Sequence, residues 1–122
     1  LACLGVDAYL DTLGMKPLTP GTLDLLVLRT LGTRSLHGYG IAVRLKELSD
    51  EVLLVEEGTL YPALHRMERR GLLCSEWGKT DTGRRARFYS ATDEGAAHLK
   101  SERKAWQDQA RLVGRMLGVE LA

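Results

Sequence analysis

Hydrophobic residues recur every three or four positions in the first half of the chain, which is the spacing of one face of an α-helix. Residues 23–31 are so apolar that a helix there should be largely buried. The segment Pro20-Gly21-Thr22 breaks the chain before them and offers an N-cap, and Gly32 supplies a stop. A turn over 37–40 precedes a second predicted helix, 41–48, in which an apolar stripe lies on one side and charged residues on the other. The pattern therefore predicts two short helices that share one core.

A third helix is predicted from about residue 57 to Gly71. Its buried stripe consists of three residues at positions i, i+4 and i+7: Leu60, Leu64 and Met67. Pro62 must then lie near the first turn, where a missing backbone N–H is tolerated. The short apolar run 52–55 before this helix predicts either a brief strand or an extended connection.

The second half of the chain predicts a β-hairpin and one long helix. Residues 72–77 and 86–90 are typical of strands, and the polar loop 78–85 between them carries two glycines. From a candidate N-cap at Thr92, helical periodicity continues to about residue 117, which corresponds to a length of about 39 Å. Three helices, a hairpin and a long helix, in this order, predict a mainly α winged helix-turn-helix fold. In this fold the second and third helices form the helix-turn-helix, and the hairpin is the wing.

The composition fits one globular domain, with 122 residues of which 44% are hydrophobic and 27% charged. A net charge of +1 excludes a uniformly basic tail and an acidic disordered chain. Cys3 and Cys74 lie far apart, which favours two reduced thiols over a disulfide scaffold or a zinc site. The N-terminus has no basic region ahead of an apolar one, so we expect no secretory signal and a cytoplasmic location. Residues 1–14 precede the first methionine and are interpreted as an extension, either helical or non-native.

Positive charge is concentrated in one part of the chain. Between residues 59 and 87, seven basic residues stand against three acidic ones, a net charge of +4 in a chain of +1. A basic helix followed directly by a basic loop is the electrostatic pattern of a DNA-binding face. An ordinary solvated helix surface and a solubilising loop are the alternative interpretation.

The predicted DNA contacts come mainly from the third helix and the wing. Opposite the buried stripe of the helix lie Thr59, Pro62, Ala63, Arg66 and Arg70, with Tyr61, His65 and Arg69 beside them. Arg66 is predicted to reach guanine O6 and N7 with two hydrogen bonds, which is worth about 1–3 kcal/mol of discrimination. On the wing, we predict that Lys79, Arg84 and Arg85 contact phosphates or the minor groove, which positions the protein without reading sequence. Tyr39, in the turn before the second helix, completes the predicted set.

The last helix carries an apolar seam that needs a partner. The seam alternates spacings of four and three and is interrupted by one arginine: Leu99, Arg103, Trp106, Ala110, Val113 and Leu117. Because so long a helix outruns a small core, we expect a homodimer formed by a dimerisation helix, 92–122, that follows a winged-helix domain, 15–91. A two-fold dimer would present two recognition helices to a palindromic site. Trp106 is interpreted as dimer packing or, alternatively, as a wall of an interface cavity that stacks on a flat ligand.

Catalytic and metal-binding patterns are weak. The three histidines, His37, His65 and His98, have no metal-ligand spacing. No nucleophile elbow, P-loop or zinc-protease motif is present. No apolar run approaches the roughly 18 residues that a membrane span needs. We therefore expect no enzymatic activity, no cofactor, no metal and no membrane partner.

Several of these segments together resemble the PadR family of bacterial transcriptional regulators. Gly58-Thr-Leu-Tyr-Pro-Ala-Leu-His-Arg-Met-Glu-Arg-Arg-Gly-Leu is close to the family's recognition-helix signature, G-x-L-Y-P-x-L-x-R-L-E-x-x-G-L. The wing resembles the family's through Trp77 and Gly83-Arg-Arg-Ala-Arg-Phe-Tyr, and the last helix through Thr92-x-x-Gly95. Looser likeness surrounds Leu18-Thr-Pro-Gly-Thr and His37-Gly-Tyr-Gly-Ile. The resemblance spans about residues 15–117 and matches the small branch with a single C-terminal dimerisation helix.

The resemblance implies a homodimeric repressor that binds operator DNA, lacks enzymatic activity and responds to small aromatic or amphipathic molecules. Four residues match the family's DNA-contact positions: Tyr61, Arg66, Arg84 and Arg85. Trp106 matches the tryptophan that lines a drug-binding pore between subunits in some small members. Met67 replaces the usual leucine, and Ala86-Arg87-Phe88 stands where Arg-Lys-Tyr is common.

Two other functions remain open on the sequence alone. One is a DNA-binding regulator without a small-molecule ligand, in which Trp106 only packs. The other is a winged-helix protein-interaction module whose basic face binds an acidic partner. Salt-dependent, sequence-selective binding to duplex DNA separates either regulator from the interaction module.

Overall fold

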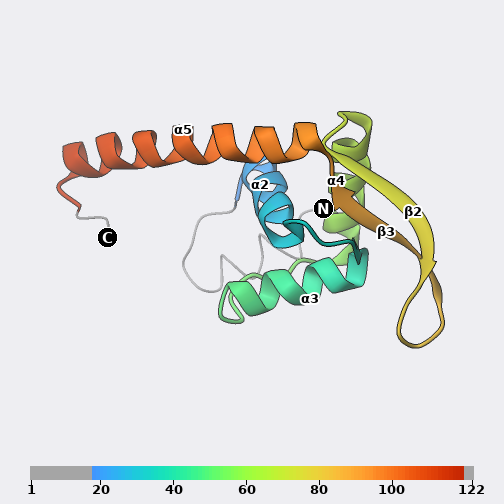
Figure 1. Cartoon of the computed structure of the whole chain (residues 1–122). Coiled ribbons are helices and arrows are strands. Elements are labelled where there is room, and N and C mark those ends of the chain that lie inside the picture. The colour runs from blue at the N-terminus through green and yellow to red at the C-terminus, as the bar shows by residue number, and fades with distance from the viewer. Residues whose placement is uncertain (1–17, 120–122) are drawn as a thin grey trace.

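The computed structural model describes residues 18–119, so the predicted extension 1–14 lies outside the described residues. The element order is α2 (Pro20–Leu31), β1 (Leu36–His37), α3 (Gly38–Leu48), α4 (Glu57–Arg69), β2 (Leu73–Lys79), β3 (Arg85–Ala91) and α5 (Asp93–Leu117). Helices α2, α3 and α4 form one packed unit, the β2–β3 hairpin projects beside α4, and α5 crosses the end of the unit opposite the hairpin tip (Figure 1). This arrangement is the predicted winged helix-turn-helix, with the hairpin as its wing.

Two helices begin earlier than the sequence predicted. The N-cap of α2 is Thr19 instead of Thr22, and the Thr19 hydroxyl accepts a hydrogen bond from the Thr22 N–H at 3.3 Å. Pro20 then occupies the first turn, where a missing N–H costs nothing. Helix α3 begins at Gly38, because His37 has the extended backbone of an N-cap. Tyr39 therefore lies in the first turn of a helix and not in a free turn.

The sheet is larger than the predicted hairpin. The two-residue strand β1, which the sequence pattern did not predict, pairs antiparallel with β3, so the strand order is β1-β3-β2. The hairpin strands also run further than predicted, because Lys79 pairs with Arg85 and only residues 80–84 remain in the loop. Lys79 and Arg85 thus belong to strands, whereas the sequence placed both in the loop. Residues 52–55 form the extended connection, not a strand.

The core lies between the three helices and the sheet. Its most deeply buried side chains are Val27, Leu28, Leu31, Ile41, Leu60, Leu64, Met67 and Tyr89, and this confirms the predicted stripe of α4. Ala63 is also fully buried, so its predicted place on the exposed face is wrong. The physical reason is its spacing, since Ala63 lies three residues after Leu60 and four before Met67 and shares their side of the helix.

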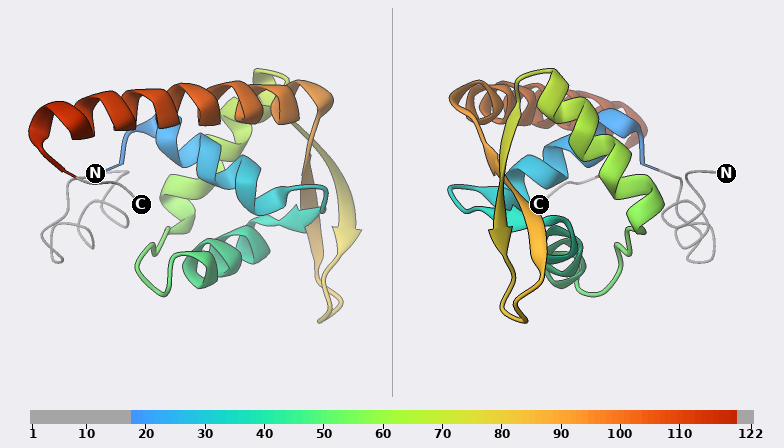
Figure 2. Two further views of the ribbon diagram at one scale, coloured as in Figure 1. Left: turned by 60° about the vertical axis from the view of Figure 1, so that its left-hand side comes forward. Right: turned by 90° about the vertical axis from the view of Figure 1, so that its right-hand side faces the viewer.

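Helix α5 is fixed at its start and free at its end. The Thr92 hydroxyl accepts a hydrogen bond from the Gly95 N–H at 3.0 Å and donates one to the Gly71 carbonyl at 2.6 Å, which confirms Thr92 as the N-cap. A Cβ atom on Gly95 would lie 2.1 Å from the Leu72 carbonyl oxygen, so only glycine permits this close approach. The C-terminal half of α5 extends past the other described elements (Figures 1 and 2). Across residues 18–119, no helix is long and apolar enough to cross a membrane.

Candidate nucleic-acid interface

The exposed side of α4 carries most of the residues predicted to read DNA. Pro62, His65, Arg66 and Arg69 are exposed, and Thr59 is half-buried. Helix α4 begins at Glu57, as predicted, so Pro62 is its sixth residue and lies inside the helix, beyond the first turn where it was expected. Its missing N–H leaves the carbonyl oxygen of residue 58 without the usual helical donor. The exposed side therefore presents two arginines and a histidine around a proline.

Tyr61 joins α4 to the start of α3. A Cβ atom on Gly38 would lie 2.6 Å from the Tyr61 ring, so glycine at this position is what lets the ring pack against the α3 backbone. Burial, and secondarily the negative charge of Glu57, raises the pKa of the Tyr61 phenol above its usual 10.0, while Arg84 acts in the opposite direction. Tyr61 is therefore a neutral hydrogen-bonding group held in place by the helix-turn-helix.

A groove of about 680 Å³ separates the wing from α4 and the first turn of α3. Five of the predicted DNA contacts line it: Tyr39, Tyr61, His65, Arg84 and Arg85. Trp77 and Arg87 also line it, although neither residue is among the DNA contacts predicted from the sequence. The alternation of side chains along a strand could have predicted their position. Trp77, Arg85 and Arg87 all lie on the sheet face that carries buried Tyr89. The three arginines of the lining outnumber its two acidic residues, Glu57 and Asp81, so the arginines can bind phosphates here.

Trp77 lies under the arginines of the wing. The Arg85 guanidinium carbon is 4.4 Å from the centroid of the Trp77 ring, and that of Arg87 is 5.4 Å away. Both distances fall within the range of cation–π attraction. The indole is nevertheless 55% exposed, so it orients the arginines at the surface and is not itself part of the core.

Not every predicted contact lies in the groove. Lys79, Arg66 and Arg69 are exposed but do not line it. The positive charges of Arg66 and Arg70 lower the pKa of Asp24 in α2, against the larger, opposite effect of burial. A second predicted surface residue, Arg70, pairs with buried Asp24 at 3.6 Å. Arg70 is therefore engaged within the chain, which the sequence did not anticipate.

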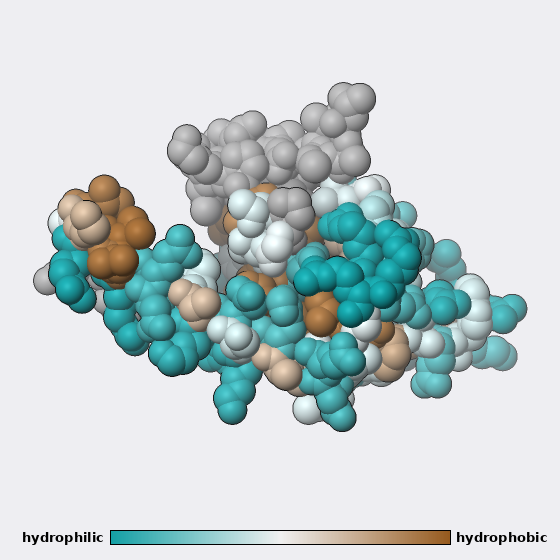
Figure 3. Space-filling view, turned by 90° about the horizontal axis from the view of Figure 1, so that it is seen from above, coloured by the Kyte–Doolittle hydropathy of each residue, from teal (hydrophilic) through white to brown (hydrophobic). Residues whose placement is uncertain are grey.

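The predicted seam of α5 divides into two parts. Leu99 packs against the core of its own chain, whereas Trp106 is 61% exposed and Ala110 is half-buried. Toward the C-terminus the exposed hydrophobic residues number more than predicted: Leu112, Val113, Met116, Leu117 and Val119. Seen from above, hydrophobic surface gathers at this free end, while the visible remainder of α5 is mostly hydrophilic (Figure 3). A second set of hydrophobic residues, at 112, 116 and 119, repeats at intervals of four and three and could have predicted this wider apolar surface.

A smaller groove of about 340 Å³ lies between α5 and the start of α2. Trp106 and His98 line it from α5, Asp24 from α2, and Arg70 from just beyond the end of α4. Burial raises the pKa of the Asp24 carboxyl above its usual 3.8, because a charged carboxylate is poorly solvated there. One oxygen of this carboxyl, Oδ1, is buried without a hydrogen-bond partner.

Together, a helix-turn-helix, an exposed basic face on its second helix and an arginine-rich wing define a winged-helix DNA-binding protein. Residues 27–101 match the family described as "Transcriptional regulator PadR-like family". The "Transcriptional regulator Rv3488" of Mycobacterium tuberculosis (strain ATCC 25618 / H37Rv) is 38% identical over 99 residues, which are 81% of this chain and 89% of that protein. The chain belongs to the PadR-like family of transcriptional regulators.

Solved structures of the same family share the fold. A PadR family transcriptional regulator from Eggerthella lenta DSM 2243 is 35% identical, with a TM-score of 0.69 over 82% of this chain and 85% of that one. A PadR family transcription regulator from Clostridium difficile R20291 is 29% identical, with a TM-score of 0.68 over 80% of this chain and 99% of that one. The protein is thus a DNA-binding transcriptional regulator, and its family is not a class of enzymes.

Proposed function

We propose that the protein is a homodimeric repressor that binds a palindromic operator. The single observation that supports the proposed dimer is the hydrophobic end of α5, where Met116 is 79% exposed and Leu117 is 72% exposed. Exposed residues of this size on a projecting helix are typical of an interface. A two-fold axis through this end of α5 places one recognition helix on each side and so matches two half-sites.

In each half of the proposed dimer, the exposed side of α4 enters the major groove. Arg66 and Arg69 then lie near base edges, and the arginines of the wing follow the adjacent phosphates. The groove between α4 and the wing accommodates the DNA backbone between these two regions. The residues that line the groove support this docking. Tyr39, Tyr61 and His65 can each donate a hydrogen bond to a phosphate oxygen that lies beside Arg84 and Arg85.

We propose further that an aromatic or amphipathic effector releases the DNA. Trp106 and the partner subunit's Trp106 would stack on a flat molecule at the dimer interface. The small groove beside Trp106 also contains Arg70, which follows the recognition helix directly, so occupation of this groove would act on α4. The competing possibility is that Trp106 packs against the partner and that no small molecule binds.

The repressor proposal is tested with the DNA upstream of the protein's own gene. In a mobility-shift assay with excess nonspecific competitor, the wild-type protein should bind selectively, and Arg66→Ala should lose at least about tenfold in affinity. Arg111→Ala removes the same charge from the exposed surface of α5 and should bind like the wild type. Transcription from this promoter in vitro should fall when protein is added. Increased transcription would instead identify an activator.

The effector proposal needs a separate optical test. Replacing the exposed wing tryptophan by Trp77→Phe leaves Trp106 as the remaining tryptophan fluorophore. Titration with acridine orange should quench this fluorescence, and the dye should not bind to a variant that also carries Trp106→Ala. If the dye binds equally well to both proteins, Trp106 is packing only, and the regulator without a ligand is the better description.

A further inference from the structure

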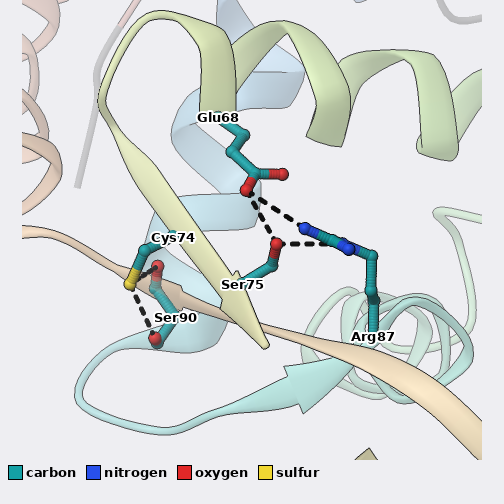
Figure 4. Close-up of polar contacts among 5 residues, drawn as sticks. All are labelled: Glu68, Cys74, Ser75, Arg87 and Ser90. Atoms are coloured by element: carbon teal, nitrogen blue, oxygen red, sulfur yellow. Dashed lines mark hydrogen bonds and ion pairs between the residues drawn. The ribbon is translucent and has the colours of Figure 1, made fainter. Parts of the chain in front are cut away.

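A polar network joins the recognition helix to the wing. The Ser75 hydroxyl of β2 donates to Glu68 Oε2 of α4 at 2.7 Å, and Arg87 Nε of β3 donates to the same Ser75 oxygen at 3.0 Å. The Arg87 guanidinium also lies 3.6 Å from Glu68 Oε2. Figure 4 shows the three side chains converging in the space between α4 and the hairpin.

The network continues along the wing toward its tip. Arg87 lies directly opposite Trp77 in the ladder, and the Trp77 ring is shared between Arg87 and Arg85. Antiparallel strands place all of these side chains on one face, the face that lines the large groove. An uninterrupted series of contacts therefore runs from Glu68 through Arg87 and Trp77 to Arg85.

The arginines of the wing are not equivalent. Arg87 is half-buried, and its guanidinium is engaged by Glu68, Ser75 and Trp77. Arg84 and Arg85 are exposed near the loop, and neither has an acidic partner within ion-pair distance among the described residues. Charge alone would assign all three arginines to DNA, whereas the contacts separate Arg87, which is paired with Glu68, from two exposed arginines without an acidic partner among the described residues.

We infer that Glu68 and Arg87 are positioning residues that set the angle of the wing against the recognition helix. Their work is to place Arg84 and Arg85 at a defined distance from the α4 side chains, so that helix and wing contact DNA in register. This inference rests on the proposal that α4 and the wing both bind DNA, and it adds that an acidic residue on the recognition helix strengthens binding to a polyanion.

The inference is tested by whether DNA affinity rises or falls when Glu68 loses its charge. Glu68→Gln and Glu76→Gln each remove one negative charge, but Glu76 is exposed on the opposite face of β2, beyond this network. Simple electrostatics predicts that both variants bind the upstream DNA slightly more tightly. The positioning role predicts that Glu68→Gln alone binds about fivefold more weakly, the loss that a modest contact energy gives. Hydroxyl-radical footprints should show wing protection lost and recognition-helix protection kept.

A charge exchange separates positioning from direct contact. Arg87→Glu should bind weakly, and adding Glu68→Arg should restore most of the affinity and the wing footprint, because the ion pair is rebuilt in reverse. If Arg87 itself binds phosphate, the exchanged pair stays as weak as Arg87→Glu, and the inference is wrong. It is equally wrong if Glu68→Gln behaves like Glu76→Gln.

The docking itself is checked with Arg85→Ala. This variant should lose the wing footprint whether or not Glu68 positions the wing. If the wild type shows no protection at the position of the wing, or if Arg85→Ala leaves that protection unchanged, Arg85 does not contact DNA there, and the proposed docking fails before the positioning role is reached. Thermal unfolding of each variant, at one protein concentration, identifies any loss of binding that comes from loss of the fold.

Discussion

Single residues in the helix-turn-helix are positioned by close packing against residues that are distant in the sequence. Tyr61 was predicted from the sequence as a DNA contact, but its support was not, because Gly38 lies 23 positions earlier and the packing of its backbone on the ring exists only in the folded chain. The predictions for Arg66 and Arg70 were limited in the same way, because contacts that form only on folding cannot be read from the sequence. The sequence placed both on one exposed face, and only the fold pairs Arg70 with Asp24.

Gly38→Ala should displace the Tyr61 ring. The added methyl would lie 2.6 Å from the ring, and overpacking of this kind costs about 1–3 kcal/mol. We expect weaker DNA binding together with lower stability, measured by mobility shift and by urea unfolding. The matched control is Gly58→Ala in α4, where a methyl meets nothing within 4 Å, and this variant should be as stable as the wild type or slightly more so. Equal effects of the two substitutions would contradict a specific role for Gly38.

At the scale of elements, the sequence predicted helices and hairpin strands well and their ends less well. Strong periodicity identified α4 and α5, and the N-cap of α5 was correct because a threonine precedes two acidic residues. Strand β1 was missed because two residues carry no periodic signal, and its pairing partner lies about 50 positions away. The hairpin loop was predicted too long because Gly78 and Lys79 read as loop residues, although their partners on β3 hold them in the ladder.

The contact between α2 and the end of α4 predicts a pH dependence of stability. Burial raises the folded-state pKa of Asp24 above its usual 3.8, so the folded chain keeps this proton to higher pH than the unfolded chain does. The stabilising contribution of Asp24 is therefore complete below 3.8 and is lost as the pH rises through the raised pKa. Relative to Asp24→Asn, the wild type should lose free energy of unfolding between about pH 4 and pH 7.

Urea unfolding of the two proteins at both pH values, at equal protein concentration, measures this difference. Asp81→Asn in the exposed wing loop is the control and should follow the wild type. Arg70→Ala should destabilise more at pH 7 than at pH 4, because it removes the ion-pair partner of a buried carboxylate. A wild type that gains stability over Asp24→Asn with rising pH would contradict the assignment.

At the scale of the whole molecule, the fold and its family were predictable, and the assembly remains a prediction. The seam of α5 was read as one stripe, whereas the chain uses Leu99 for its own core and exposes a larger apolar group near the C-terminus. Sequence spacing shows that a helix has an apolar side, but it does not show which part of that side the chain covers itself.

The double variant Leu112→Glu/Met116→Glu should convert the proposed dimer into monomers. Burial of each of these side chains at an interface is worth about 1.5–3 kcal/mol, so their loss should weaken the dimer at least about a hundredfold. Sedimentation equilibrium measures this change, and operator affinity should fall with it. Gln107→Glu, on the exposed middle of α5, is the control and should remain dimeric. A double variant that stays dimeric would place the interface elsewhere.

The attachment of α5 at Thr92 and Gly95 makes this helix a lever with its pivot beside the recognition helix. The Thr92 hydroxyl holds the Gly71 carbonyl, just past the end of α4, and the far end of α5 lies about 37 Å away along the helix axis. A tilt of only about 5° would move that end by about 3 Å, close to the rise of about 3.4 Å per base pair along the DNA axis. In the proposed dimer, small adjustments where the two α5 helices meet would therefore shift the separation of the recognition helices by about a base-pair step and put them in or out of register with the proposed operator.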